Sequence, residues 1–173
     1  MAYPVVSAPY GLKPMNEIGG LPYAGSTRMV PIPSGFSSSI GNGDIVYIAN
    51  GVLTNGTVLN TDSASAVAGT IGIFIGAEFT NPNSPLLGKM RQNFWPANTV
   101  TNDAVAYVVD DPNVVFKAVV LAYQANGTST ADTTLQFVSQ AYVGTNLAPV
   151  SSAVNLPLIS NGQIGVSTVG LVA

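Results

Sequence analysis

The sequence predicts an all-β fold, with a β-barrel or β-sandwich body, an extended N-terminal arm and at most one short helix. The first observation is that Asn-Gly pairs recur along the chain. Asn-Gly favours the type I′ turn of a tight β-hairpin, because both of its residues readily adopt positive φ. The second is that β-branched and aromatic runs of strand length lie between these pairs. The pairs are Asn42-Gly43, Asn50-Gly51, Asn55-Gly56, Asn126-Gly127 and Asn161-Gly162.

Residues 1–36 are predicted to form the arm. Proline fixes φ, lacks an amide donor and biases the preceding residue towards extended backbone, so no long helix fits where it recurs. The segment is also too apolar for a disordered linker, and packing must therefore order it. It either folds over its own domain or lies on a neighbouring subunit, and its residues favour neither arrangement. Its prolines are Pro4, Pro9, Pro14, Pro22, Pro31 and Pro33.

Residues 37–173 are predicted to form the β body. The central strand is expected over residues 71–79, where Gly72 and Gly76 mark bulges or close approaches of neighbouring backbone. Pro112 separates two later strands. The other expected strands cover residues 44–49, 52–53, 57–59, 104–110, 114–123, 154–159 and 164–172.

One short helix is predicted near residue 135. Thr130 or Asp132 can serve as its N-cap and Gly144 can end it. Apolar residues recur at helical spacing in between, although β-branched residues in the same stretch favour a strand. The apolar positions are Leu135, Val138 and Tyr142.

The chain carries very little charge. Only 8% of its residues are charged, against roughly 25% in an average soluble domain. Its five cations and net charge of −3 argue against nucleic acid as a partner. The most apolar stretch, residues 114–123, contains Lys117 and is too short to cross a membrane as a helix, so no membrane partner is expected either. The sparse charge instead indicates a surface that other protein covers.

The composition also removes most catalytic chemistry. The chain has no Cys and no His. It therefore lacks disulfides, thiolate ligands, thiol nucleophiles and the imidazole base of a Ser-His-Asp triad. No phosphate-binding glycine loop is present, and no lysine lies in a Ser-x-x-Lys motif. We expect neither an enzyme nor a cofactor.

The densest charge in the chain is the acidic group Asp103, Asp110 and Asp111. These residues lack the alternating spacing of a calcium loop. Asp and Asn beside Pro112 are ordinary turn formers, because their side chains bond to nearby backbone amides. A turn is therefore the preferred interpretation.

Trp95 lies close to Lys89 and Arg91. An aromatic residue beside cations can serve as a sugar-binding platform, as a cation–π pair or as an interface anchor. The preferred interpretation is a surface turn that leads into a strand, with the indole packed on the β body.

Several short segments together resemble the capsid decoration (cement) proteins of tailed bacteriophages of the marine and cyanobacterial type. They occur in the expected order over most of the chain. The segments are Tyr10-Gly11-Leu12-Lys13-Pro14, Ala24-Gly25-Ser26-Thr27-Arg28, Gly43-Asp44-Ile45-Val46-Tyr47, Gly72-Ile73-Phe74-Ile75-Gly76-Ala77, residues 104–112 and Ile164-Gly165-Val166-Ser167.

This resemblance implies a structural virion protein with no catalytic residues, located on the exterior of an icosahedral shell. Its partner would be the major capsid protein, whose neighbouring subunits it would clamp, and it would form a homo-trimer or another homo-oligomer there. Two alternatives stay open, namely another virion component (tail, fibre-base or head–tail protein) and a carbohydrate-binding module that uses Trp95.

The residues predicted to contact a partner lie mainly in the arm. Deleting residues 1–30 is expected to abolish shell binding while the β body stays folded. The predicted contact residues are Tyr10, Leu12, Pro14, Tyr23, Arg28 and Trp95.

Overall fold

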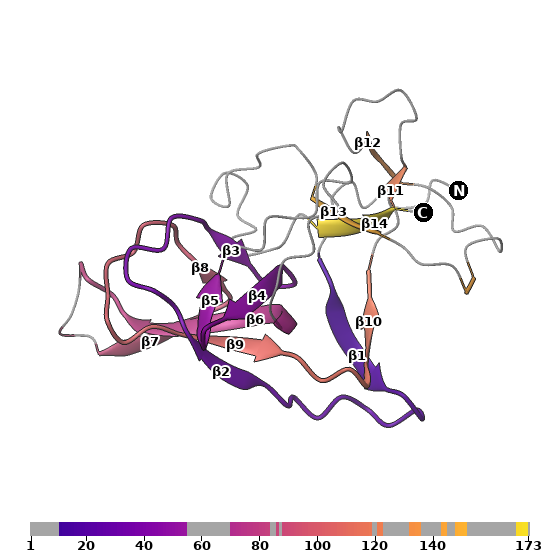
Figure 1. Cartoon of the computed structure of the whole chain (residues 1–173), viewed down its shortest axis with the longest axis horizontal. Helices are drawn as coiled ribbons and strands as arrows, with labels where there is room; N and C mark the ends of the chain where they lie inside the picture. Colours follow the sequence, from indigo (N-terminus) through magenta and orange to yellow (C-terminus); the bar gives the residue numbers. More distant parts are fainter. Residues whose placement is uncertain are drawn as a thin grey trace, which may run out of the picture.

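The computed structural model of this chain describes residues 11–54, 70–83, 86, 88–118, 121–122, 132–135, 143–144, 148–151 and 169–172. These residues form antiparallel strands and contain no α-helix (Figure 1). The fold is all-β, as the sequence predicts.

The largest sheet has six strands, in the order β2–β9–β6–β4–β5, and β7 pairs with β6 beyond the end of β4. The long strand β6 is the central strand of this sheet. It pairs with β9 along one of its edges, and with β4 and then β7 along the other. The strands are β2 (Arg28–Pro31), β4 (Ile45–Ala49), β5 (Val52–Thr54), β6 (Thr70–Thr80), β7 (Lys89–Gln92) and β9 (Val105–Val109).

The remaining strands form two-stranded ribbons, each antiparallel. One ribbon, β1–β10, lies to the right of the large sheet in Figure 1, and β3–β8 lies above the middle of the sheet, where both of its strands contact β6. The ribbons are β1 (Lys13–Glu17) with β10 (Val114–Lys117), β3 (Ile40–Gly41) with β8 (Phe94–Trp95), β11 (Leu121–Ala122) with β12 (Asp132–Leu135), and β13 (Ala148–Ser151) with β14 (Val169–Val172).

Two glycines let β6 lie close to its neighbours. A Cβ on Gly72 would clash with Cγ1 of Val108, and a Cβ on Gly76 would lie 2.7 Å from the carbonyl oxygen of Gln92. The pairing of β6 with β9 shifts register between Phe74 and Gly76. Both features that the sequence predicted for these glycines, close approach and a bulge, are therefore confirmed.

The turn between β4 and β5 is the predicted Asn-Gly hairpin. Asn50 has φ of 52° and Gly51 has φ of 78°, as a type I′ turn requires. The pairs Asn55-Gly56, Asn126-Gly127 and Asn161-Gly162 lie outside the described residues, as do residues 57–59 and 154–159.

The main core lies on one face of the large sheet. It includes Phe74, Leu53 and Val108, all fully buried, and the segments around β3 and β8 cover it with Ile40 and Trp95. Phe79 meets Trp95 edge to face, with ring centroids 5.0 Å apart and an interplanar angle of 71°. This geometry is the favoured one for aromatic pairs.

A second, smaller core joins the β1–β10 ribbon to the opposite face of the sheet. Ile73, Val109 and Val114 are its buried members. Leu12 and Tyr23 pack against it. The N-terminal residues that the structure describes therefore lie over their own domain, and residues 1–10 lie outside the described part.

The helix predicted near residue 135 is not found where the structure describes that segment. Residues 132–135 form β12, in which Leu135 pairs with Leu121. The β-branched Thr133 and Thr134 prefer extended backbone, and a partner strand supplies the hydrogen bonds that a helix would otherwise make. Residues 136–142 lie outside the described part.

No helix among the described residues has the length and apolar character needed to cross a membrane.

Candidate interaction surface

The sheet face opposite the main core carries an exposed group of side chains, which we call the outer sheet face. Strand register places its members together, because Met29 is directly opposite Tyr107 and Glu78 is directly opposite both Arg91 and Val105. Directly opposed residues of an antiparallel pair project on the same side of the sheet. The five residues come from β2, β6, β7 and β9.

Three of these residues form a connected polar group. The Tyr107 hydroxyl donates a hydrogen bond to Oε2 of Glu78 at 2.8 Å. The guanidinium carbon of Arg91 lies 4.2 Å from the centroid of the Tyr107 ring, in a cation–π contact. The hydrogen bond to Glu78 is the main cause that raises the pKa of Tyr107 above its ordinary value. The hydrogen bond and the cation–π contact together hold the phenol in a defined orientation.

An apolar side chain adjoins this group. Met29 is 65% exposed although it lies within a strand of the large sheet. Met, Tyr and Arg are enriched in protein–protein interfaces, where they supply apolar area together with oriented polar groups. The outer sheet face therefore has the composition of an interface more than that of an ordinary solvated surface.

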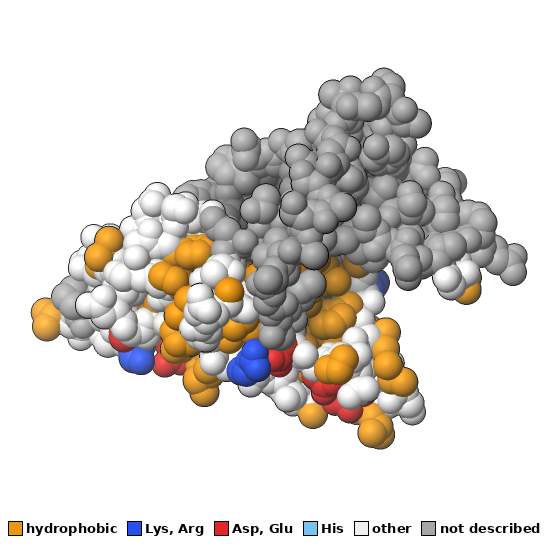
Figure 2. Space-filling view, viewed as in Figure 1, with side chains coloured by type: hydrophobic (Ala, Val, Ile, Leu, Met, Phe, Trp, Pro, Cys, Tyr) orange, Lys and Arg blue, Asp and Glu red, His pale blue; other side chains and the backbone are white. Residues whose placement is uncertain are grey.

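A second exposed apolar group lies at the free end of the β1–β10 ribbon, and we call it the ribbon tip. It consists of Met15, Ile18, Leu21 and Val115, of which Ile18 is 69% exposed. Figure 2 shows hydrophobic side chains gathered at this end of the molecule (lower right). Acidic side chains adjoin this hydrophobic group in the same view.

The residues predicted as partner contacts are not brought together on this surface. Leu12 and Tyr23 are half-buried against the second core, and the Tyr23 hydroxyl donates to the carbonyl of Ser26 at 2.7 Å. Burial raises the pKa of Tyr23. Pro14 is half-buried within β1, and Tyr10 lies outside the described residues.

Arg28 lies in the edge strand β2 directly opposite Val108, and its side chain therefore projects on the core side of the sheet, not on the outer sheet face. Its Nε lies 3.1 Å from Oδ2 of Asp110, and its side chain stays half-exposed. An exposed ion pair of this kind contributes little to folding stability. The guanidinium is therefore positioned by Asp110 while part of it remains accessible.

Trp95 has no accessible surface, since its exposed fraction is 0%. The preferred interpretation, in which the indole packs on the β body, is therefore confirmed, and Trp95 offers no surface to a partner or a sugar in this chain. The physical reason is that β8 pairs with β3 and turns the indole into the main core against Phe79. Arg91, near it in sequence, instead meets Tyr107 on the opposite face of the sheet.

The acidic residues form separate structural contacts. Asp111 accepts hydrogen bonds from the backbone amide of Asn113 at 2.8 Å and from its side chain at 3.1 Å, which is the turn that the sequence predicts. Asp110 pairs with Arg28, and Asp103 binds Thr80 and Thr101. Within the described ranges no three acidic side chains gather as a metal site would require.

Sequence reasoning missed the outer sheet face. In β9, Val105, Tyr107 and Val109 project on the side of the strand that carries this face. Ala106 and Val108 project on the other side and are apolar as well. The sequence of β9 therefore does not indicate which of its two sides is exposed.

No protein-family model matches the chain, and no curated protein or solved structure is significantly similar to it.

Proposed function

We propose that this chain is a structural, non-enzymatic virion protein that decorates the exterior of an icosahedral phage capsid and clamps neighbouring major capsid subunits. The observation that carries the proposal is the outer sheet face, where Met29, Arg91 and Tyr107 lie exposed or half-exposed on a rigid all-β body. The resemblance of the sequence to capsid decoration proteins names the partner.

The low charge of the chain supports the same role. Thirteen formal charges are spread over an accessible surface of 10471 Å². Some of these charges are engaged with neighbours, as in the ion pair Arg28–Asp110 and the cation–π contact of Arg91 with Tyr107. Because each charge is expensive to desolvate, a surface with so few charges costs less to cover with protein than an ordinary surface does.

On a shell of repeated subunits, each contact between this chain and the shell can be weak while the whole attachment is strong. A stable contact buries about 1,000 Å² or more in total. A homo-oligomer, for which the resemblance suggests a trimer, would engage several sites at once, and the linked contacts would strengthen one another through effective concentration.

The proposal is tested first by the copy number of this chain relative to the major shell protein in particles purified from the source. Near-stoichiometric amounts are expected for a decoration protein. A handful of copies would assign it to the tail or the portal, and absence from particles would refute a virion role.

A matched pair of variants then tests the surface. Met29→Asp places a charge on the outer sheet face and is expected to weaken attachment to particles by at least about tenfold, the scale of a single well-buried interface residue. Val100→Asp is the control, because Val100 is 66% exposed, as Met29 is at 65%, but lies in the loop after β8. Equal loss in both variants would contradict the assignment of the outer sheet face.

A further inference from the structure

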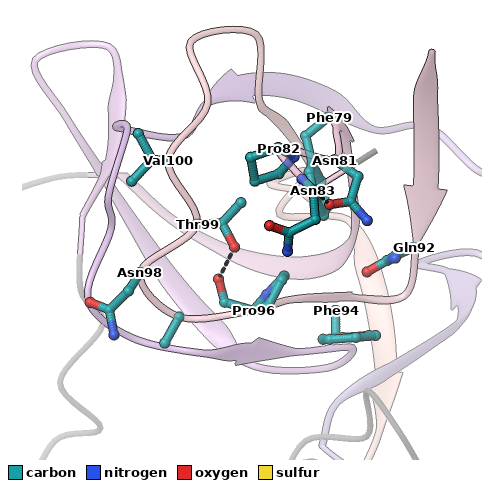
Figure 3. A pocket seen from close by; sticks show the side chains of 11 residues that line it. Phe79, Asn81, Pro82, Asn83, Gln92, Phe94, Pro96, Asn98, Thr99 and Val100 are labelled. Atoms are coloured by element: carbon teal, nitrogen blue, oxygen red, sulfur yellow. Dashed lines mark hydrogen bonds between the residues drawn. The ribbon is translucent and has the colours of Figure 1, made fainter. Parts of the chain in front are cut away.

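A pocket of about 600 Å³ opens between the β6–β7 end of the sheet and the loop that follows β8. Its size lies within the range of small-molecule sites, about 300–1,000 Å³. Figure 3 shows Asn81, Asn83 and Gln92 on one side, with Phe94 and Pro96 facing them. The pocket is on the core side of the sheet, away from the outer sheet face.

The loop that forms one wall is held in place by hydrogen bonds. The Thr99 hydroxyl donates to the carbonyl of Pro96 at 2.8 Å, and the Thr99 carbonyl accepts from the amide of Gly35 at 2.9 Å. The amide of Asn98 donates to the carbonyl of Phe36 at 2.8 Å. Asn98 itself has φ of 58°, a left-handed conformation that Asn tolerates better than most residues. The wall is therefore preorganised.

The lining is polar but carries no charge among the described residues. Its polar groups are mainly carboxamides, from Asn81, Asn83, Asn98 and Gln92, and its apolar part includes the rings of Phe79 and Phe94. A carboxamide offers both a hydrogen-bond acceptor and two donors, as a cluster of hydroxyl groups on a ligand also does.

One of these groups is buried and unsatisfied. Oε1 of Gln92 is inaccessible to solvent and has no hydrogen-bond partner, while Nε2 of the same side chain donates to Sδ of Met90 at 3.4 Å. Figure 3 shows the oxygen end of this carboxamide turned toward the pocket, so a rotation of the side chain would expose Oε1 as an acceptor to a bound ligand. A buried acceptor without a partner costs free energy that a ligand donor would recover.

We propose that this pocket binds a neutral sugar residue. The Phe94 ring would pack against the apolar C–H face of the pyranose, and the carboxamides of Asn83 and Gln92 would bond to its hydroxyl groups. The absence of charge in the described lining disfavours phosphate, carboxylate or amine ligands. The inference is independent of the capsid role.

A peptide segment is the other neutral ligand to consider, and the geometry favours it less. Peptides in extended form are usually recognised by a free strand edge. The lining of this pocket is gathered from the end of β6, the turn after it, Gln92 of β7 and the loop after β8, so it is not one continuous strand edge.

The test is a titration of the purified full chain with glucose, galactose, mannose and N-acetylglucosamine, followed by saturation-transfer NMR and calorimetry. At least one sugar is expected to bind in the millimolar range. Phe94→Leu and Gln92→Met, which keep apolar volume but remove the aromatic face and the acceptor, should each weaken binding about tenfold. Asn102→Ala, an exposed amide outside the pocket, should leave binding unchanged.

Gln92 and Phe94 are half-buried, so their variants could fail to fold. Asn83→Ala is a further variant that tests sugar binding in that case. Asn83 is exposed, and its hydrogen bond to Oδ1 of Asn81 comes from the backbone amide, which alanine retains. The proposal is overturned if none of the four sugars binds, if binding is the same in Asn83→Ala and Phe94→Leu as in the native chain, or if triglycine binds at the pocket and the sugars do not.

Discussion

Asp103 holds Thr80 through both oxygens of its carboxylate. Oδ1 accepts the backbone amide of Thr80 at 3.1 Å and Oδ2 accepts its hydroxyl at 2.6 Å. The Thr101 hydroxyl also donates to Oδ1, and Nζ of Lys89 lies 3.9 Å from Oδ2. Asp103 thus ties the end of β6 to the loop before β9, and the hydroxyl of Thr101 followed by the two donors of Thr80 holds its pKa well below the usual range.

Replacing Asp103 with Asn is expected to lower the free energy of unfolding by about 1–2 kcal/mol at neutral pH, since the amide nitrogen cannot accept the bonds that the carboxylate accepts. The folded-state pKa is depressed, so the stabilisation is present above the unfolded pKa of about 3.9 and is lost as the pH falls below it. Urea denaturation between pH 7 and pH 3 should therefore show a steeper loss for the native chain than for Asp103→Asn. Parallel pH profiles would contradict this role.

Glu78→Gln is expected to lower the pKa of Tyr107 towards its ordinary value, because the hydrogen bond to the Glu78 carboxylate is the main cause of its increase. The measurement is an ultraviolet titration of tyrosine ionisation, with Tyr107→Phe subtracted to isolate this residue. Since the folded-state pKa is raised, the contribution of this group to stability is lost as the pH rises through it. An unchanged Tyr107 titration in Glu78→Gln would show that the carboxylate is not the cause.

Gly76→Ala is expected to destabilise the fold by more than about 2 kcal/mol, because the new Cβ would lie 2.7 Å from the backbone oxygen of Gln92 and the paired strand would have to move. Gly20→Ala is the comparison. It has open space around it but φ of 85°, so only backbone strain of about 1 kcal/mol is expected. Thermal and urea denaturation measure the stability of both variants. A larger loss of stability in Gly20→Ala than in Gly76→Ala would contradict the close approach of the Gln92 carbonyl to Gly76.

Trp95→Ala is expected to cost about 3–5 kcal/mol, as is usual when a large buried aromatic residue is removed. Trp95→Phe should cost much less. It keeps an aromatic ring near Phe79 and removes the indole Nε1, which is buried and has no hydrogen-bond partner. Equal losses in the two variants would show that the indole itself, not aromatic packing, stabilises the core.

Deleting residues 1–30 is expected to abolish cooperative unfolding, in contrast to the expectation drawn from the sequence. The deletion removes β1 and most of β2, including Val30, which is buried in the main core and pairs with Ala106. Circular dichroism with thermal denaturation measures the outcome. A deletion of residues 1–10, which removes none of the described strands, is the control and should keep the transition.

The sequence by itself determines the all-β class, the central strand and the Asn50-Gly51 turn. These features depend on local chemistry, because positive φ at Asn-Gly, β-branched side chains and the missing Cβ of Gly72 and Gly76 act within a few residues of chain. The low charge also follows from the composition alone. The same is true of the exclusion of thiol and imidazole chemistry, because the chain has no Cys and no His.

Only the tertiary structure decides which apolar residues stay exposed. Trp95 and Met29 both lie in short strands, yet one is fully buried and the other is 65% exposed. The difference depends on non-local pairing, since β3 and β8 cover one face of the sheet while nothing in the described part covers Met29 and Tyr107 on the other. The pocket beside Gln92 arises in the same way, where β6–β7 and the loop after β8 meet although they are separate in sequence.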